Sequence, residues 1–132
     1  MIITHSKRSF DTTMQSLKDS IEQRGLTLFA QIDHSGGARA AGMELAEEQL
    51  LVFGSPRGGT PLMQSDPRVG IELPLRMLLW QEGERTLLGY EDPRALGERF
   101  SLGDVEQALA QLSTLLATLA EEAASGETQG IT

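Results

Sequence analysis

The sequence predicts a small layered α/β domain, on the border of the α+β class, built on one mixed sheet. Three observations predict this class. Apolar runs of strand length alternate with helical segments in the first half, two further apolar runs flank a short turn, and a long amphipathic segment follows. The expected order is therefore β-α-β-α-β-α, then a β-hairpin, then C-terminal helices.

The first half begins with an apolar-to-polar stretch, 1–9, which we interpret as a strand near a sheet edge. The next segment has an apolar residue every three or four positions, and this spacing predicts a one-faced helix that Ser9 or Asp11 caps and Gly25 ends. The apolar positions of this helix are Phe10, Met14, Leu17 and Ile21. Two more strands are expected at 26–32 and around 50–53, where the apolar run is continuous.

A glycine-rich corner follows each of these two strands. In the first, Ser35 is expected to cap a short helix over 38–41. In the second, GSPRGG at 54–59 precedes Thr60 and Pro61, which we expect to be the N-cap and first residue of a helix. If crossovers link the strands, both helix N-termini lie at the same edge of the sheet, where α/β proteins usually bind ligands.

The second half reads as a hairpin followed by helices. The strands are expected at 73–80 and 85–90, around the turn 81–84, and the hairpin should be antiparallel. A short helix is expected over 94–100 after Pro93, and an amphipathic helix over 105–120. We therefore expect one domain over residues 1–123 and a flexible tail over 124–132.

Composition excludes several classes of protein. The 132 residues carry a net charge of −8, so a basic nucleic-acid or anionic-membrane footprint is absent and neither is expected as a partner. The chain has no cysteine, which removes disulfides, thiol catalysis and thiolate metal sites. No signal-peptide pattern or membrane-length apolar run is present, and a cytoplasmic location is the default expectation.

The second corner offers a candidate ligand site. Glycine amides and a helix N-terminus favour an anion, Arg57 would add a cation, and Met63 an apolar wall. The expected ligand-binding residues here are Ser55, Arg57, Gly59, Thr60 and Met63. Neither a P-loop nor a dinucleotide fingerprint is present. The alternative is that the glycines only turn the chain tightly beneath a packed helix.

His34, which follows the first of the two strands, is the candidate for proton transfer and a further ligand-binding candidate. Asp33 would point the other way if the strand continued, so the two do not form a dyad. The alternative is a histidine that serves the neighbouring corner. Only His5 and His34 are available as imidazole ligands, so no metal site is expected, and the sequence does not identify a cofactor. A hydrolase is disfavoured because no G-x-S-x-G elbow exists.

The order of several motifs resembles the bacterial and archaeal family called domain of unknown function 302. These motifs are IDH at 32–34, LVFGSP at 51–56, GTPLMQ at 59–64, GIELPLR at 70–76, WQE at 80–82 and YEDP at 90–93. The chain differs from the usual family pattern at Ser55 and Glu91, where asparagine is more common. The resemblance implies a small α/β domain that forms homodimers, and it implies no reaction. Trp80 is a candidate contact in such a dimer.

Three functions remain open from sequence. The first is a homodimeric module that binds a small ligand, which could be anionic, between the two corners. The second is an enzyme of unknown class that uses His34 as a general acid or base in the same pocket. The third is a purely structural or protein-interaction domain. The first two predict that His34 and Arg57 converge on one cavity, and the third predicts that they lie apart or are buried in satisfied contacts.

Overall fold

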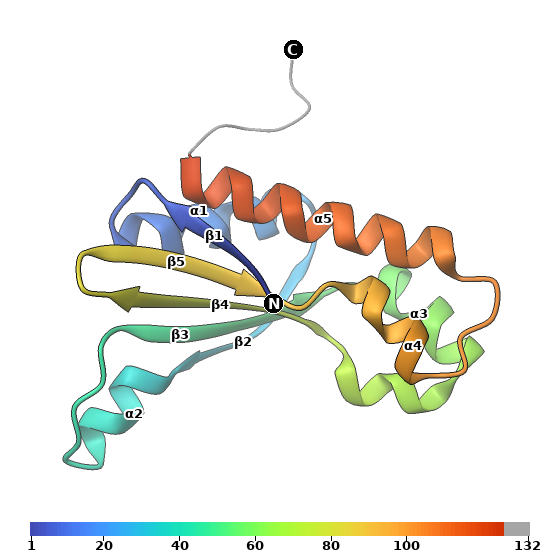
Figure 1. Cartoon of the computed structure of the whole chain (residues 1–132), viewed down its shortest axis with the longest axis horizontal. Coiled ribbons are helices and arrows are strands. Elements are labelled where there is room, and N and C mark those ends of the chain that lie inside the picture. The colour runs from blue at the N-terminus through green and yellow to red at the C-terminus, as the bar shows by residue number, and fades with distance from the viewer. Residues whose placement is uncertain (126–132) are drawn as a thin grey trace.

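The computed structural model describes residues 1–125 of the chain and contains one five-stranded sheet with helices (Figure 1). The strands are β1 (Ile2–Ser6), β2 (Thr27–Asp33), β3 (Glu48–Gly54), β4 (Leu75–Glu82) and β5 (Arg85–Tyr90). The α-helices are α1 (Phe10–Gln23), α2 (His34–Ala40), α3 (Pro56–Ser65), α4 (Leu96–Arg99) and α5 (Glu106–Ser125). Two 3₁₀ helices are also present, η1 (Pro67–Glu72) and η2 (Pro93–Ala95). The α/β class and the predicted order of elements are confirmed.

The sheet is not mixed, as the sequence had suggested, but antiparallel throughout. Its strand order is β1-β5-β4-β3-β2, and each neighbouring pair is antiparallel. The chain crosses the sheet once, through α1, from β1 at one edge to β2 at the other. After β2 it passes through α2 and turns back beside the strand it has just left. The segment between β2 and β3 is therefore a long hairpin connection and not a crossover.

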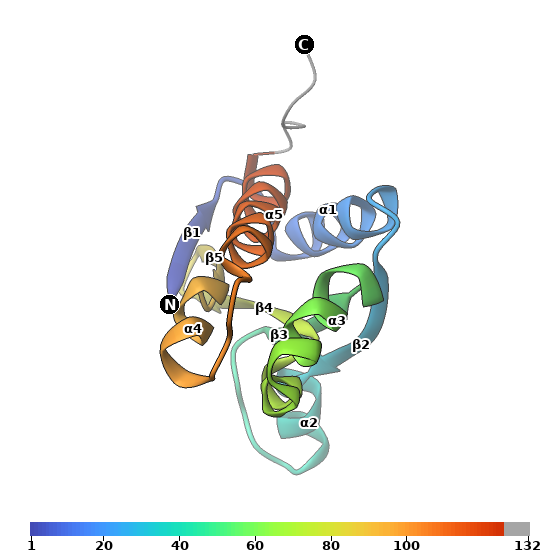
Figure 2. The same cartoon turned by 90° about the vertical axis from the view of Figure 1, so that its right-hand side faces the viewer.

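The core lies between the sheet and two helices, α1 and α5, which cover the same face (Figure 2). The predicted stripe of α1 is buried there, and Ser9 caps this helix by accepting a hydrogen bond from the backbone N–H of Thr12. Gly25 follows with a φ of +70°, which suits glycine at a helix end. Alternate strand residues complete the core, including Leu51 and Phe53 of β3.

The helix α5 extends beyond the predicted end at 120, to Ser125, and buries Ala123 and Ala124 against the core. Ala124 also accepts a backbone hydrogen bond from Lys7, which ties the end of α5 to the end of β1. The tail that we expected at 124–132 thus starts inside this helix, and its residues 126–132 lie outside the described part of the chain.

Candidate functional site

The two glycine-rich corners lie at opposite ends of the sheet and do not form one site. Because β2 and β3 are antiparallel, the end of β2 at Asp33 pairs with Gln49, whereas the end of β3 at Gly54 pairs with Thr27. The six residue steps along β2, from Thr27 to Asp33, correspond to roughly 20 Å at about 3.4 Å each. The expectation that His34 and Arg57 converge on one cavity is therefore wrong, because it assumed that β2 and β3 run in parallel.

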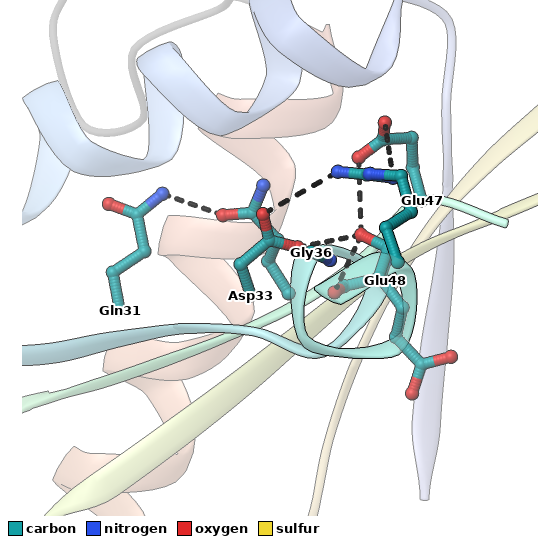
Figure 3. A network of polar contacts seen from close by, with 8 residues as sticks. Gln31, Asp33, Gly36, Glu47 and Glu48 are labelled. Atoms are coloured by element: carbon teal, nitrogen blue, oxygen red, sulfur yellow. Dashed lines mark hydrogen bonds and ion pairs between the residues drawn. The ribbon is translucent and has the colours of Figure 1, made fainter. Parts of the chain in front are cut away.

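The corner after β2 is held together by its own polar side chains (Figure 3). Asp33 is the N-cap of α2 and accepts hydrogen bonds from the backbone N–H of Gly36 at 2.8 Å and the hydroxyl of Ser35 at 2.6 Å. These bonds, the hydroxyl first, lower the pKa of Asp33. The cap is thus Asp33 and not Ser35, as the sequence had suggested, since the helix begins earlier, at His34.

Ser35 is fully buried and links this corner to the start of β3. Its hydroxyl accepts a hydrogen bond from the backbone N–H of Glu48 at 3.2 Å. Arg39 lies 4.0 Å from a carboxylate oxygen of Asp33 and 3.9 Å from one of Glu47. The polar groups around His34 are engaged with one another, and His34 itself is exposed on the surface. This arrangement favours the interpretation in which the corner serves the fold.

The corner after β3 is built differently from the prediction. The helix α3 starts at Pro56 with Ser55 as N-cap, so Thr60 and Pro61 lie inside the helix. Proline is favoured at the first helical position because its φ is already suitable and its missing N–H needs no partner there. The side chain of Ser55 makes no capping hydrogen bond.

The two glycines of α3 serve close packing and not a left-handed turn. Neither Gly58 nor Gly59 has a positive φ. A Cβ on Gly58 would lie 3.2 Å from Cδ2 of Leu112 in α5, and one on Gly59 would lie 3.4 Å from Cδ1 of Leu73. Glycine therefore allows α3 to approach α5 and the segment before β4 closely. This result supports the alternative in which the glycines serve packing, but they lie inside α3 and do not form the tight turn that the alternative assumed.

The same packing leaves a cavity of about 350 Å³ beside the start of α3. It is lined by Ser55, Gly59, Thr60 and Met63, four of the six predicted ligand-binding residues, whereas Arg57 and His34 do not line it. The other walls come from the start of β2, the segment before β4 and the middle of α5. The lining side chains from these walls that the sequence prediction missed are Leu26, Phe29, Leu73, Pro74, Leu75, Leu112 and Leu115.

The chemistry of this cavity, which we call the corner pocket, is mainly apolar. The hydroxyls of Ser55 and Thr60 are the polar side-chain groups among its lining residues. Met63, which is 38% exposed, lies at its edge, and its sulfur would be 3.4 Å from a Cβ on Gly70. The flexible thioether of methionine adapts well to an apolar ligand.

The buried carboxylate of Asp66 holds the segment that follows the pocket. It accepts hydrogen bonds from the guanidinium and the backbone N–H of Arg68, and from the backbone N–H of Ser101 at 2.9 Å. The bonds from Arg68 are the main reason why the pKa of Asp66 lies well below its ordinary value of 3.8, although burial opposes the shift. Asp66 therefore joins η1 to the connection between α4 and α5.

Low pH should weaken the link that Asp66 makes between η1 and the connection from α4 to α5. Because the pKa of Asp66 is lowered in the folded state, its carboxylate contributes stability above about pH 4, and this contribution disappears as the pH falls towards the folded pKa. We expect Asp66→Asn to be less stable than the parent at pH 7 and to lose stability less steeply between about pH 5 and pH 2. Urea unfolding at several pH values across this range measures how steeply the free energy of unfolding changes with pH. The exposed Asp104→Asn is the control, and equal slopes for all three proteins would contradict the assignment.

Residues 1–125 contain neither a cluster of metal-ligating side chains nor a helix suited to cross a membrane. No group of three or more histidine, aspartate or glutamate side chains in this part of the chain is arranged to hold a metal ion. No helix there combines the length and the apolar character needed to cross a membrane.

Comparison with curated proteins finds relatives that are longer than this chain. Three Brucella proteins, from B. suis biovar 1 (strain 1330), B. abortus biovar 1 (strain 9-941) and B. melitensis biotype 1 (strain ATCC 23456), are each 35% identical over 104 residues. They are named fluoride-specific ion channels, FluC 1 in the first two species and FluC 2 in the third. The match covers 78% of this chain but only 38–41% of those proteins.

A solved structure and a family model cover most of the chain. The crystal structure of an uncharacterized conserved DUF302 protein from Bacillus stearothermophilus matches with a TM-score of 0.84 over 92% of this chain and 96% of that one. At 18% identity, this similarity demonstrates the fold alone. The model of the family described as domain of unknown function DUF302 matches residues 2–119. With nearly the whole domain matched, the chain belongs to the DUF302 family.

Proposed function

We propose that this DUF302 domain is a homodimeric binding module that holds a small, mainly apolar molecule in the corner pocket. The observation that carries the proposal is the pocket itself. Its volume of about 350 Å³ lies within the range of small-molecule sites, and its walls are apolar side chains with a few hydroxyls. Apolar walls supply affinity there, and the hydroxyls of Ser55 and Thr60 can orient one polar group of the ligand.

The position of the two cations changes the chemistry expected of the ligand. Arg57 is exposed and does not line the pocket, and His34 lies at the other end of the sheet. An anion would therefore meet no cationic side chain among the lining residues. A neutral molecule with a ring or a short chain suits this lining better than the anionic ligand that the sequence suggested.

The alternative of an enzyme using His34 has little geometric support. A general base must lie within hydrogen-bond reach of the proton that it removes, directly or through one water molecule. His34 is separated from the corner pocket by roughly 20 Å of β2 and β3, at about 3.4 Å per residue. A reaction in the pocket would have to use other groups.

Blocking the pocket should abolish binding of a neutral apolar dye. Thr60 is an exposed lining residue of α3, so Thr60→Trp can place an indole in the pocket with little risk to folding. We expect Nile red to bind the parent, with an increase in fluorescence, and to bind Thr60→Trp at least about tenfold more weakly. Gln64→Trp, one turn further along the exposed side of α3, is the matched control and should keep the affinity of the parent.

Equal binding of the dye by Thr60→Trp and Gln64→Trp would contradict binding in the corner pocket. Arg57→Ala separates the two ligand chemistries. If the ligand is neutral, this variant keeps its affinity for Nile red. A marked loss of affinity for an anionic dye in Arg57→Ala, combined with no binding of the neutral dye, would restore the anionic interpretation.

The curated relatives favour a second candidate function. Each contains a DUF302-like segment within a longer protein named as a fluoride-specific ion channel. We propose as the second candidate that this chain acts together with such a channel. In a strain that produces a fluoride channel, growth in fluoride should then change when the gene for this chain is deleted. Unchanged growth would remove this candidate.

A further inference from the structure

The second face of the sheet carries a row of apolar residues that runs across the five strands. Successive side chains along a strand point to opposite faces of the sheet. The residues next to the core residues in each strand therefore point away from α1 and α5. The register places one residue of each strand side by side in this row, in the order Ile3, Gly89, Leu78, Leu50 and Ile32. We call this surface the open face.

The two ends of the row are well exposed, with Ile3 at 50% and Ile32 at 43%, and Leu50 and Leu78 between them are half-buried. Antiparallel sheets with one covered face normally carry polar residues on the other. An apolar row across this face departs from that pattern and is typical of a surface that packs against another molecule.

The aromatic side chain of Trp80 also lies on the open face. Its ring lies over Gly89, where a Cβ would come within 3.0 Å of the ring, and its Nε1 donates a hydrogen bond to Glu82. The side chain is half-buried, so part of it remains accessible to solvent. Partly exposed tryptophan is enriched in protein interfaces.

We infer that a second copy of this chain packs on the open face, sheet against sheet. This inference rests on the homodimer in the proposed function and names its surface. Five strands at about 4.8 Å spacing and six residues at about 3.4 Å give a face of roughly 400 Å² in projection. With the contribution of its rim, such a face approaches the roughly 800 Å² per partner that is standard for stable complexes. The net charge of −8 disfavours nucleic acid and anionic lipid as occupants.

The charges on the open face fit a two-fold axis along the apolar row. The row of Val52 and Arg76 lies on one side of it, and the row of Glu48 and Trp80 lies at the same spacing on the other. A rotation by half a turn about this axis therefore places Leu78 of one copy against Leu78 of the other. It also sets Arg76 of one copy against Trp80 and beside Glu48 of the other. A guanidinium is attracted both to an indole face and to a carboxylate.

Charged substitutions on the open face test this surface. Light scattering with size-exclusion chromatography should give the parent twice the chain mass of 14.3 kDa. Leu78 and Ile32 both lie in the apolar row, so in Leu78→Lys or Ile32→Lys the dimer would bring the new lysine of one copy close to that of the other. We expect the dimer dissociation constant to rise about a hundredfold in each variant. Ala117→Lys is the matched control, because Ala117 is exposed on α5, the helix that covers the opposite face of the sheet. It should remain dimeric.

The only tryptophan of the chain gives a second readout. The emission of Trp80 should shift to the red when the parent is diluted to monomer, and it should start red-shifted in folded Ile32→Lys. If Leu78→Lys fails to fold, Ile32→Lys decides the matter, since its side chain is more exposed. A parent dimer that both variants preserve would overturn the open face as the interface but not the dimer. A parent that is monomeric at about 100 μM would overturn both, and dye binding would still test the pocket.

Discussion

Replacing Phe53 with alanine is expected to lower the free energy of unfolding by about 3–5 kcal/mol. Phe53 is fully buried in β3, the strand next to the centre of the sheet, and belongs to the cluster between the sheet and α1 and α5. Its removal leaves a cavity that the surrounding helices can fill only in part. A domain of this size has about 5–15 kcal/mol of stability, so the loss is a large fraction of the whole.

Urea unfolding followed by circular dichroism measures this loss. Phe29→Ala is the matched control, because it removes the same atoms from a side chain that is 55% exposed at the edge strand β2. We expect the control to lose less than about 1 kcal/mol. Equal losses for the two variants would mean that the core is not organised around β3 as described.

A second large loss of stability is expected when the ion pair that links the end of α1 to α5 is broken. Nη2 of Arg24 donates to Oε2 of Glu122 at 2.6 Å, and the side chain of Glu122 is only 7% exposed. Arg24→Met keeps most of the apolar stem but removes the cation from a buried carboxylate. The expected loss is about 1–3 kcal/mol, smaller than for a fully buried pair because the Arg24 side chain is one-third exposed.

A double-mutant cycle separates this electrostatic effect from packing. Adding Glu122→Met to Arg24→Met removes the buried carboxylate as well and should recover most of the lost stability, since an apolar pair often replaces a buried ion pair at little cost. Chemical unfolding of the two single variants and the double variant gives the coupling. A double variant that is less stable than Arg24→Met by the full cost of Glu122→Met alone would show that the two side chains act independently.

The helices that cover the core could be predicted because their signal is local. A spacing of three and four residues places Phe10, Met14, Leu17 and Ile21 on one face of α1 regardless of the rest of the chain. The same holds for α5 up to Leu119, but the last turn of α5 was missed, since its buried residues are one glutamate and two alanines, which resemble a polar, weakly apolar tail.

The direction of strand pairing could not be predicted, because it depends on contacts distant in sequence. The local pattern of strand, glycine-rich corner and helix is compatible with a parallel crossover or with a long hairpin connection. The prediction that His34 and Arg57 share one site depended on the parallel alternative. With parallel strands His34 would lie near Arg57, whereas the antiparallel pairing of Asp33 with Gln49 takes it to the other end.

The corner pocket was predicted in part for the same reason. Ser55, Gly59, Thr60 and Met63 lie on one continuous segment, so local reasoning could group them. The opposite walls come from β2, from the segment before β4 and from Leu112 and Leu115 of α5. No local pattern links residues so far apart. The apolar character of the pocket follows from these distant walls and so was missed.

The most direct test of the corner pocket is a titration of ¹⁵N-labelled protein with Nile red, followed through the backbone amide signals of the glycines. We expect the amides of Gly58, Gly59 and Gly70 at the pocket to shift with the dye. Gly36 and Gly37, beside His34 at the other end of the sheet, should not move. Shifts confined to Gly36 and Gly37, or no shifts at any of these glycines, would contradict a binding site in the corner pocket.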